Sequence, residues 1–130
     1  MSTDTTASVS THILDTSAGR PAVGVAVFLA ARGGPHEDWA SLGSSRTGAD
    51  GRCTDLPALP EGTGQVRLAF ETEMYFSTGG TEAHQDAPRG RDGEVSFFPE
   101  VAVTFTVSPG EHYHVPLLLS PFGYSVYRGS

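Results

Sequence analysis

The chain has 130 residues, of which 38% are hydrophobic, and its formal net charge is −7 at pH 7. This length supports one domain with a sizeable core, and an acidic chain without a basic stripe is not a nucleic-acid-binding protein. All eight basic residues are arginines, which excludes Schiff-base chemistry and a phosphate-loop lysine.

The first residues are polar and are expected to form a disordered tail over 1–7, ahead of one domain over 8–130. The tail has neither the basic nor the apolar region of a secretory signal, and no apolar stretch approaches the length of a membrane span. The single cysteine, Cys53, has no partner for an internal disulfide and is interpreted as a buried thiol. These features favour a cytoplasmic protein.

Alternating hydrophobic residues predict short strands in the first half of the chain. Strands are expected over 9–15, 22–30, 39–46 and 65–71, and a shorter one begins at Arg52. The side chains expected to share a buried face are Val23, Val25, Val27 and Leu29 in the second strand, and Val66, Leu68 and Phe70 in the fourth. The glycine-rich turn at 48–51 is expected to end a hairpin just before Arg52.

The second half continues this pattern after one short helix. The helix is expected over 72–76 with Thr72 as its cap, and a loop without periodicity is expected over 77–94. Further strands are expected over 95–107, 112–120 and 124–128. Many short strands, turns between them and almost no helix predict an all-β protein built as an antiparallel β-sandwich.

Two histidines in the predicted strand 112–120 are the first candidates for chemistry. His112 and His114 are two residues apart and therefore project from the same face. They can bind a metal if a third ligand converges, and His12 lies on another predicted strand. They can also act as acid and base, because histidine titrates near neutrality and neighbouring imidazoles shift one another's pKa. A solvent-exposed strand face is the third interpretation, and the spacing leaves all three open.

Arg52 is the candidate cation for the same site, and the nearby Arg46 is the alternative. His36 and His84 lie in expected loops and are interpreted as solvated. No nucleophile elbow, phosphate-binding loop or zinc-protease motif is present. From the residues alone, the sequence predicts a β-sandwich with a histidine–arginine site.

The end of the chain, HYHVPLLLSPFGYSVYRGS over residues 112–130, resembles the C-terminal signature of the 5-hydroxyisourate hydrolases. These are the transthyretin-related enzymes of urate breakdown. Shorter blocks that match the same family lie at 11–15, 19–21, 47–52 and 97–100. The resemblance implies two four-stranded sheets with one short helix, assembled as a homotetramer that is a dimer of dimers.

The resemblance also implies which residues form the site. The catalytic residues would be His12, Arg52, His114 and Ser130, and the substrate-binding residues would be His112, Tyr127, Arg128 and Gly129. In the related hormone carrier transthyretin, lysine, glutamate and threonine stand at the positions of His12, Arg52 and His114. The site residues of this chain therefore match the enzymes rather than the carrier, and no metal or cofactor is expected.

The implied reaction is hydrolysis of 5-hydroxyisourate to 2-oxo-4-hydroxy-4-carboxy-5-ureidoimidazoline. Histidine and arginine would assist the attack of water on the cyclic amide, without nucleic acid or membrane as a partner. The alternatives are a non-catalytic carrier of small ligands and a zinc-dependent hydrolase that uses His12, His112 and His114.

Overall fold

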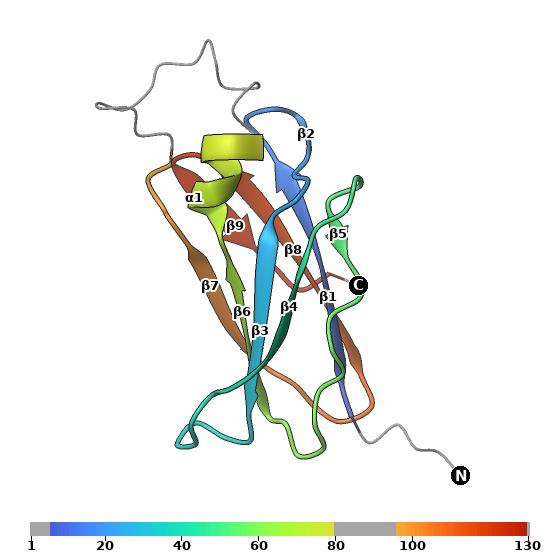
Figure 1. The fold of residues 1–130 in the computed structure, drawn as a ribbon. Helices are drawn as coiled ribbons and strands as arrows, with labels where there is room; N and C mark the ends of the chain where they lie inside the picture. Colours follow the sequence, from blue (N-terminus) through green and yellow to red (C-terminus); the bar gives the residue numbers. More distant parts are fainter. Residues whose placement is uncertain (1–5, 80–95, 130) are drawn as a thin grey trace.

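The computed structural model describes residues 6–79 and 96–129, which form a sandwich of two β-sheets (Figure 1). The strands are β1 (Ser8–Asp15), β2 (Arg20–Pro21), β3 (Ala26–Arg32), β4 (Ala40–Arg46), β5 (Arg52–Cys53), β6 (Gln65–Phe70), β7 (Val101–Thr106), β8 (His112–Ser120) and β9 (Gly123–Val126). A short helix, α1 (Thr72–Met74), continues as the π-helical turn η1 (Tyr75–Gly79). Within the described residues, neither helical segment has the length and hydrophobicity needed to cross a bilayer.

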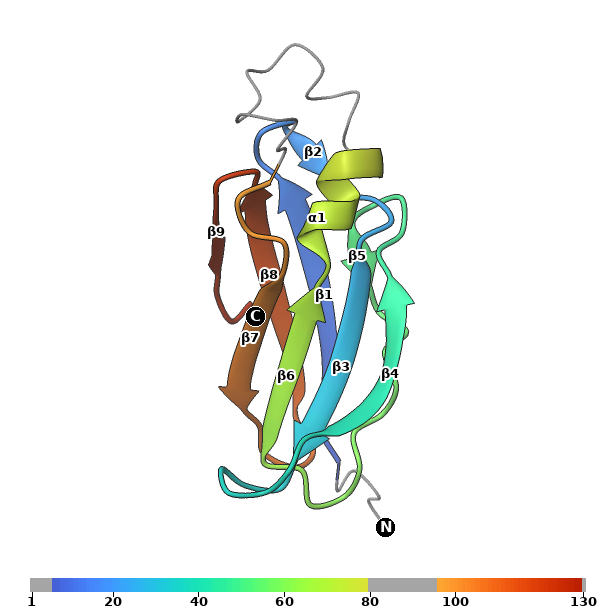
Figure 2. The same ribbon diagram turned by 60° about the vertical axis from the view of Figure 1, so that its left-hand side comes forward.

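The strands divide into two layers, which Figure 2 shows one behind the other. One sheet has the order β2-β1-β8-β9, with β5 pairing to β1, and the other has the order β4-β3-β6-β7. The predicted all-β sandwich with one short helix is therefore confirmed. The first sheet differs from the prediction in two details, because β5 is a fifth strand and β1 runs parallel to β8. The whole second sheet lies between β1 and β8 in sequence and supplies the long crossover that a parallel pair needs.

Alternation along the strands builds the core between the layers. Val66, Leu68 and Phe70 of β6 are fully buried, as predicted, and so are Ile13 of β1 and Leu117 of β8. Each of these side chains stabilises the fold by roughly 1.5–3 kcal/mol relative to an exposed position. The opposite faces of the strands remain available for a site.

The strand predicted over 22–30 starts later than expected. Gly24 has a φ of 79°, outside the β region, so β3 begins only at Ala26 and Val23 is 49% exposed. The amide of Val25 donates to the Thr47 hydroxyl instead of joining a strand ladder. The prediction that Val23 shares the buried face is therefore wrong.

The strand predicted over 95–107 also starts later, at Val101. Pro99 has no amide hydrogen for a ladder, and its carbonyl accepts from the amide of Glu73 at 3.1 Å. Thr72 is the first helical residue and Glu71 is the cap, so the prediction that Thr72 caps the helix is wrong. The hydroxyl of Thr72 donates instead to the carbonyl of Phe98 at 2.5 Å. Residues 96–100 thus anchor the start of α1 instead of pairing with a strand.

The predicted loop 77–94 and the two termini need smaller adjustments. Ser77–Gly79 belongs to η1, and the remainder of that loop lies outside the described residues. Residues 1–5 lie outside them as well, whereas Ala7, the last residue of the predicted tail, is buried in the core. At the C-terminal end, β9 stops at Val126, two residues before the predicted end of that strand.

The glycine-rich turn at 48–51 links the two sheets, so the predicted hairpin is wrong. It connects β4 of the second sheet to β5, which pairs with β1 of the first. Gly51 has a φ of 78°, and a Cβ there would lie 2.5 Å from the carbonyl oxygen of Ile13. This close passage along β1 places Arg52 directly opposite His12.

Candidate active site

The outer face of the first sheet carries the histidines. Along β8 the inward side chains Tyr113 and Val115 are buried, whereas His112 and His114 point away from the core. On β1 the outward positions include Ser8, Ser10 and His12. Parallel pairing sets Ser8 beside His112 and Ser10 beside His114. Two segments far apart in sequence therefore build one polar strip.

Hydrogen bonds connect four side chains of this strip in series. Ser8 Oγ lies 2.6 Å from Nδ1 of His112, and the Nε2 atom of the same ring lies 2.8 Å from Ser10 Oγ. Ser10 Oγ also lies 2.8 Å from Nδ1 of His114. Both nitrogens of His112 are thereby engaged, whereas Nε2 of His114 has no hydrogen-bond partner among the residues described.

His12 is held from the other side of the strip. Its Nε2 atom lies 3.0 Å from the backbone carbonyl of Asp50. A carbonyl can only accept, so Nε2 carries the proton and Nδ1 is the nitrogen left to accept one. The rings of His12 and His114 are tilted by 35°, with centroids 6.5 Å apart, so they face a common space without stacking.

Arg52 lies across from His12 on β5. Its amide donates to the Asp50 carboxylate at 3.0 Å, and its Nε lies 3.8 Å from the other carboxylate oxygen. The Arg52 side chain is half exposed, so this ion pair is weak and leaves the guanidinium free to meet an anionic group.

Burial of His114 lowers the pKa of its imidazole below the ordinary value, and electrostatic interaction with Arg52, and more weakly with the neighbouring rings of His12 and His112, lowers that pKa further. Each of these causes disfavours the protonated ring. His114 is therefore neutral at neutral pH and able to accept a proton at Nε2.

The C-terminal segment packs against the same ring. The amide of Gly129 donates to the His114 carbonyl at 2.7 Å in an isolated bridge. A Cβ at Gly129 would lie only 2.9 Å from Cδ2 of His114 and 3.2 Å from Cγ of Pro116. Only glycine permits this approach without displacement of a neighbour. Tyr127, two residues earlier, is exposed.

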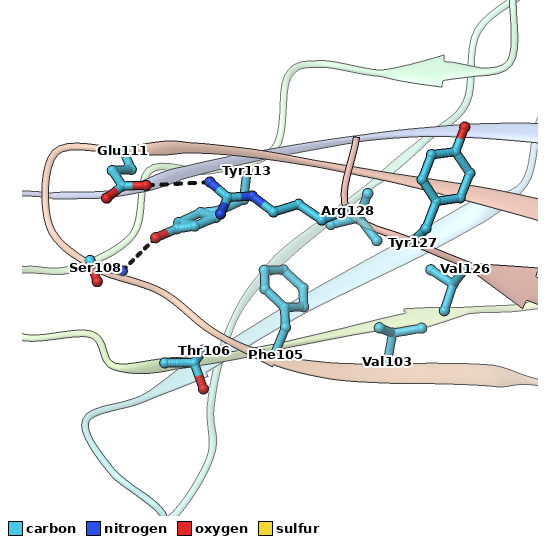
Figure 3. Close-up of a pocket in the computed structure, with 10 residues that line it drawn as sticks. Val103, Phe105, Thr106, Ser108, Glu111, Tyr113, Val126, Tyr127 and Arg128 are labelled. Carbon is cyan, nitrogen blue, oxygen red and sulfur yellow. Dashed lines mark hydrogen bonds and ion pairs between the residues drawn. The ribbon is translucent and has the colours of Figure 1, made fainter. Parts of the chain in front are cut away.

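Arg128 extends toward Glu111 and Tyr113 (Figure 3). Its guanidinium pairs with Glu111 at 3.3 Å and lies 4.4 Å above the ring of Tyr113. It borders a cavity of about 470 Å³ between β7, β8 and β9, lined mainly by apolar side chains such as Phe105 and Val126. The structure thus brings His12, Arg52 and Gly129 together with the two β8 histidines but does not bring Arg128 to them.

The remaining candidates are placed as follows. His36 is exposed in the β3–β4 loop, and the guanidinium of Arg46 donates to the Gly24 carbonyl at 3.0 Å. His84 and Ser130 lie outside the described residues. Within residues 6–79 and 96–129, no three metal-ligating side chains gather at a position that could hold a metal ion.

Sequence reasoning missed Ser8 and Ser10. Their signal is the alternation Ser8, Ser10, His12, which places all three on one face of β1. Taken together, the fold and the outward strip define a transthyretin-like sandwich with a histidine–arginine cluster on one sheet face.

Comparison with known proteins agrees with this class. The model of the HIUase/Transthyretin family matches residues 9–129, and the chain belongs to that family. The 5-hydroxyisourate hydrolase of Mus musculus is 39% identical over 124 residues, covering 94% of each chain. That of Caulobacter vibrioides is 40% identical over 123 residues, covering 94% of this chain and 97% of the relative.

Solved structures give the same result. The 5-hydroxyisourate hydrolase of Klebsiella pneumoniae superposes with a TM-score of 0.69 at 36% identity, over 94% of this chain and 98% of that one. Transthyretin of Sparus aurata gives 0.71 at 25% identity, over 93% and 95%. The predicted resemblance to this family is confirmed.

Proposed function

We propose that this protein hydrolyses 5-hydroxyisourate to 2-oxo-4-hydroxy-4-carboxy-5-ureidoimidazoline, a step of urate breakdown. The observation that carries the proposal is the facing pair His12 and His114 with Arg52 beside it. The relatives named as 5-hydroxyisourate hydrolases support it, since they match this chain over nearly its full length.

In the proposed mechanism His114 is the general base. Its neutral ring presents Nε2 to the space that it shares with His12, where a water molecule gives up a proton as it attacks the substrate carbonyl. His12 orients that water through Nδ1, while Asp50 fixes the other nitrogen. Base catalysis of this kind contributes a factor of about 10²–10⁴ to the rate.

Arg52 stabilises the charge that develops on the former carbonyl oxygen. A guanidinium is a planar cationic donor, suited to a flat substrate and to an oxyanion. Its only ion-pair partner in the described structure, Asp50, is exposed and weakly held, so the substrate competes with little loss.

The C-terminal segment completes the site in this scheme. Gly129 closes the space against His114. Ser130 follows it in the sequence with a hydroxyl as a further substrate contact. Tyr127 contributes a wall of the site, and Arg128 braces the segment through Glu111 and Tyr113.

The proposed assembly is a homotetramer, a dimer of dimers. Among residues 6–79 and 96–129, β7 and β9 end the two sheets with unpaired edges, and a second copy would cover them. We place the protein in the cytoplasm, because the free buried thiol of Cys53 fits a reducing compartment. Sedimentation and cell fractionation check these two points.

The test of the activity uses the purified protein and freshly generated 5-hydroxyisourate. Its ultraviolet decay is followed with and without a chelator, against a sample without protein. Faster decay that the chelator leaves unchanged supports the proposal. Ligand binding without faster decay would identify a carrier, and activity that is lost with chelator and restored by zinc would identify a metal-dependent hydrolase.

A further inference from the structure

We propose that the four outward side chains running from Ser8 to His114 act as a proton relay for the general base. This relay chain consists of Ser8, His112, Ser10 and His114, in that order. The inference rests on the hydrolase proposed above. It assigns His112 a role different from substrate binding, because both of its ring nitrogens already have serine partners.

Ser10 is the link that couples the two rings. Its hydroxyl lies 2.8 Å from Nε2 of His112 and 2.8 Å from Nδ1 of His114. The residue is only 6% exposed, so bulk water has little access to it. A hydroxyl has one hydrogen to donate, so it donates to one ring and accepts from the other. The tautomer of His112 therefore fixes the tautomer of His114.

Two orientations of the relay satisfy all of its hydrogen bonds. In the first, Nδ1 of His114 donates to Ser10, Ser10 donates to Nε2 of His112, and Nδ1 of His112 donates to Ser8. The lone pair on Nε2 of His114 then faces the reaction space, as a base requires. In the second orientation every donor and acceptor is exchanged, and Nε2 of His114 carries the hydrogen that an acid requires.

The proton count closes over one turnover. As water attacks the carbonyl carbon, its proton binds Nε2 of His114, and the hydrogen on Nδ1 moves to the Ser10 oxygen. The original Ser10 hydrogen moves to Nε2 of His112, which becomes the cation. When the ring nitrogen of the substrate leaves, Nε2 of His114 gives it a proton and both hops reverse, which restores the starting state.

The placement of the relay favours proton transfer over a role that only holds His114 in position. Ser8 and His112 are exposed, whereas Ser10 is buried between the rings. The positive charge formed during attack therefore moves from a partly buried ring, where burial and Arg52 disfavour it, to an exposed one. Water at the exposed end solvates that charge.

The test compares Ser10→Ala with Ser10→Thr and Ser120→Ala. Threonine keeps a hydroxyl and suits a strand. Ser120→Ala removes a β8 hydroxyl that donates to the Gly123 carbonyl, on the same face but away from the site. Ser10→Ala is expected to lower kcat about ten- to a hundredfold with KM nearly unchanged. Ser10→Thr and Ser120→Ala are expected to retain most of the wild-type kcat.

A proton inventory distinguishes proton transfer through the relay from a purely structural role of its hydrogen bonds. In mixtures of light and heavy water, the wild-type rate should follow a curved dependence that reports several protons in flight, and that of Ser10→Ala a straight line. His112→Gln, which can hydrogen-bond to Ser10 but cannot carry a proton, should behave like Ser10→Ala. The relay would be overturned if Ser10→Ala or His112→Gln kept the wild-type kcat. It would also be overturned if the rate of either variant depended on the fraction of heavy water with the same curvature as the wild type.

Nitrogen NMR of the substrate-free protein provides a readout that does not depend on activity. The charged or titratable groups facing His114 are His12 from β1, Arg52 from β5 and His112 on its own strand. The nitrogen shifts of the wild type should report the same tautomer for His112 and His114, because Ser10 bonds to both rings, and Ser10→Ala should remove this match. Different tautomers on the two rings of the wild type would overturn the relay, whereas failure of the wild type to hydrolyse 5-hydroxyisourate overturns the proposed function alone.

Discussion

At the scale of single residues, the site depends on which nitrogen of each imidazole is left free. The Asp50 carbonyl fixes the proton of His12 on Nε2, and the Ser10 hydroxyl occupies Nδ1 of His114. One acceptor nitrogen per ring is thereby available for the reaction. A catalytic base needs this arrangement before its pKa matters.

Replacement of either ring should remove the general base or its orienting partner. His12→Asn and His114→Asn should each lower turnover by about a hundredfold or more. Circular dichroism should show an unchanged fold, because both side chains lie outside the core. His36→Asn is the matched control, since His36 is exposed on a loop away from the site. A loss from His36→Asn equal to that from His114→Asn would place the site elsewhere.

Arg52 should set the pH at which the base becomes active. Burial lowers the pKa of His114 and the charge of Arg52 lowers it further, so the neutral base persists to lower pH than for a free histidine. Arg52→Gln removes one of these causes and should raise the pKa of His114. The acid limb of kcat/KM should then move to higher pH.

The control for this shift is Arg46→Gln, because Arg46 lies before the same turn but bonds to the Gly24 carbonyl. Its pH profile should match that of the wild type. An acid limb that stays in place for Arg52→Gln would show that Arg52 does not act on the ionising group.

The sequence predicted the histidines but not the serines between them, for a physical reason. Spacing along one strand shows that His112 and His114 share a face. Spacing along one strand does not indicate the register in which distant strands pair. The parallel pairing of β1 with β8 is what brings Ser10 between the two rings. A polar residue on an outward face also resembles a solvated one until its neighbour is known.

At the scale of elements, the turn at 48–51 controls the position of Arg52. Gly51→Ala should destabilise the protein by about 3 kcal/mol or more, because a left-handed alanine is strained and its Cβ meets the Ile13 carbonyl at 2.5 Å. Gly62 has a similar φ, 89°, but a Cβ there would have no atom within 4 Å. Gly62→Ala should therefore lower the free energy of unfolding by only about 1–2 kcal/mol. Denaturant unfolding measures both, and equal losses would contradict the close packing of this turn.

The C-terminal segment should position His114 through Gly129. In Gly129→Ala the new Cβ would press on the His114 ring, so turnover should fall about tenfold or more while the melting temperature stays near that of the wild type. Gly123→Ala is the matched control, because its Cβ would have only an ordinary contact with the Ser120 hydroxyl at 3.8 Å. Full activity of Gly129→Ala would mean that the segment does not shape the site.

The alternation of hydrophobic residues correctly predicted the strands that bury every second side chain. It failed where the backbone conformation or hydrogen bonding delayed the start of a strand. β6 and β8 follow the pattern closely. The starts of β3 and β7 do not, because Gly24 adopts a positive φ and Pro99 turns its carbonyl to α1. Apolar residues beside such positions continue the pattern without continuing the strand.

At the scale of the whole molecule, β7 and β9 each end a sheet with an edge that pairs with no other strand of the described residues. These two strands border the cavity lined by Phe105 and Val126, so the sandwich is apolar and incompletely packed between β7 and β9. Such an edge invites pairing with another chain. The edge formed by β4 lies at the other end of its sheet and provides an internal comparison.

A charge on the β9 edge should therefore separate the proposed tetramer, whereas the same charge on β4 should not. Ser125 of β9 and Ser44 of β4 are both exposed serines in edge strands, so Ser125→Lys and Ser44→Lys add the same charge. Lysine opposes pairing of an edge with a second chain. We propose that the active sites lie between the dimers, so activity should fall when the tetramer dissociates. Sedimentation velocity and turnover, measured on the same samples over a dilution series, test the link. A fully active monomer of Ser125→Lys would show that each chain holds a complete site, and dissociation by Ser44→Lys alone would move the interface to β4.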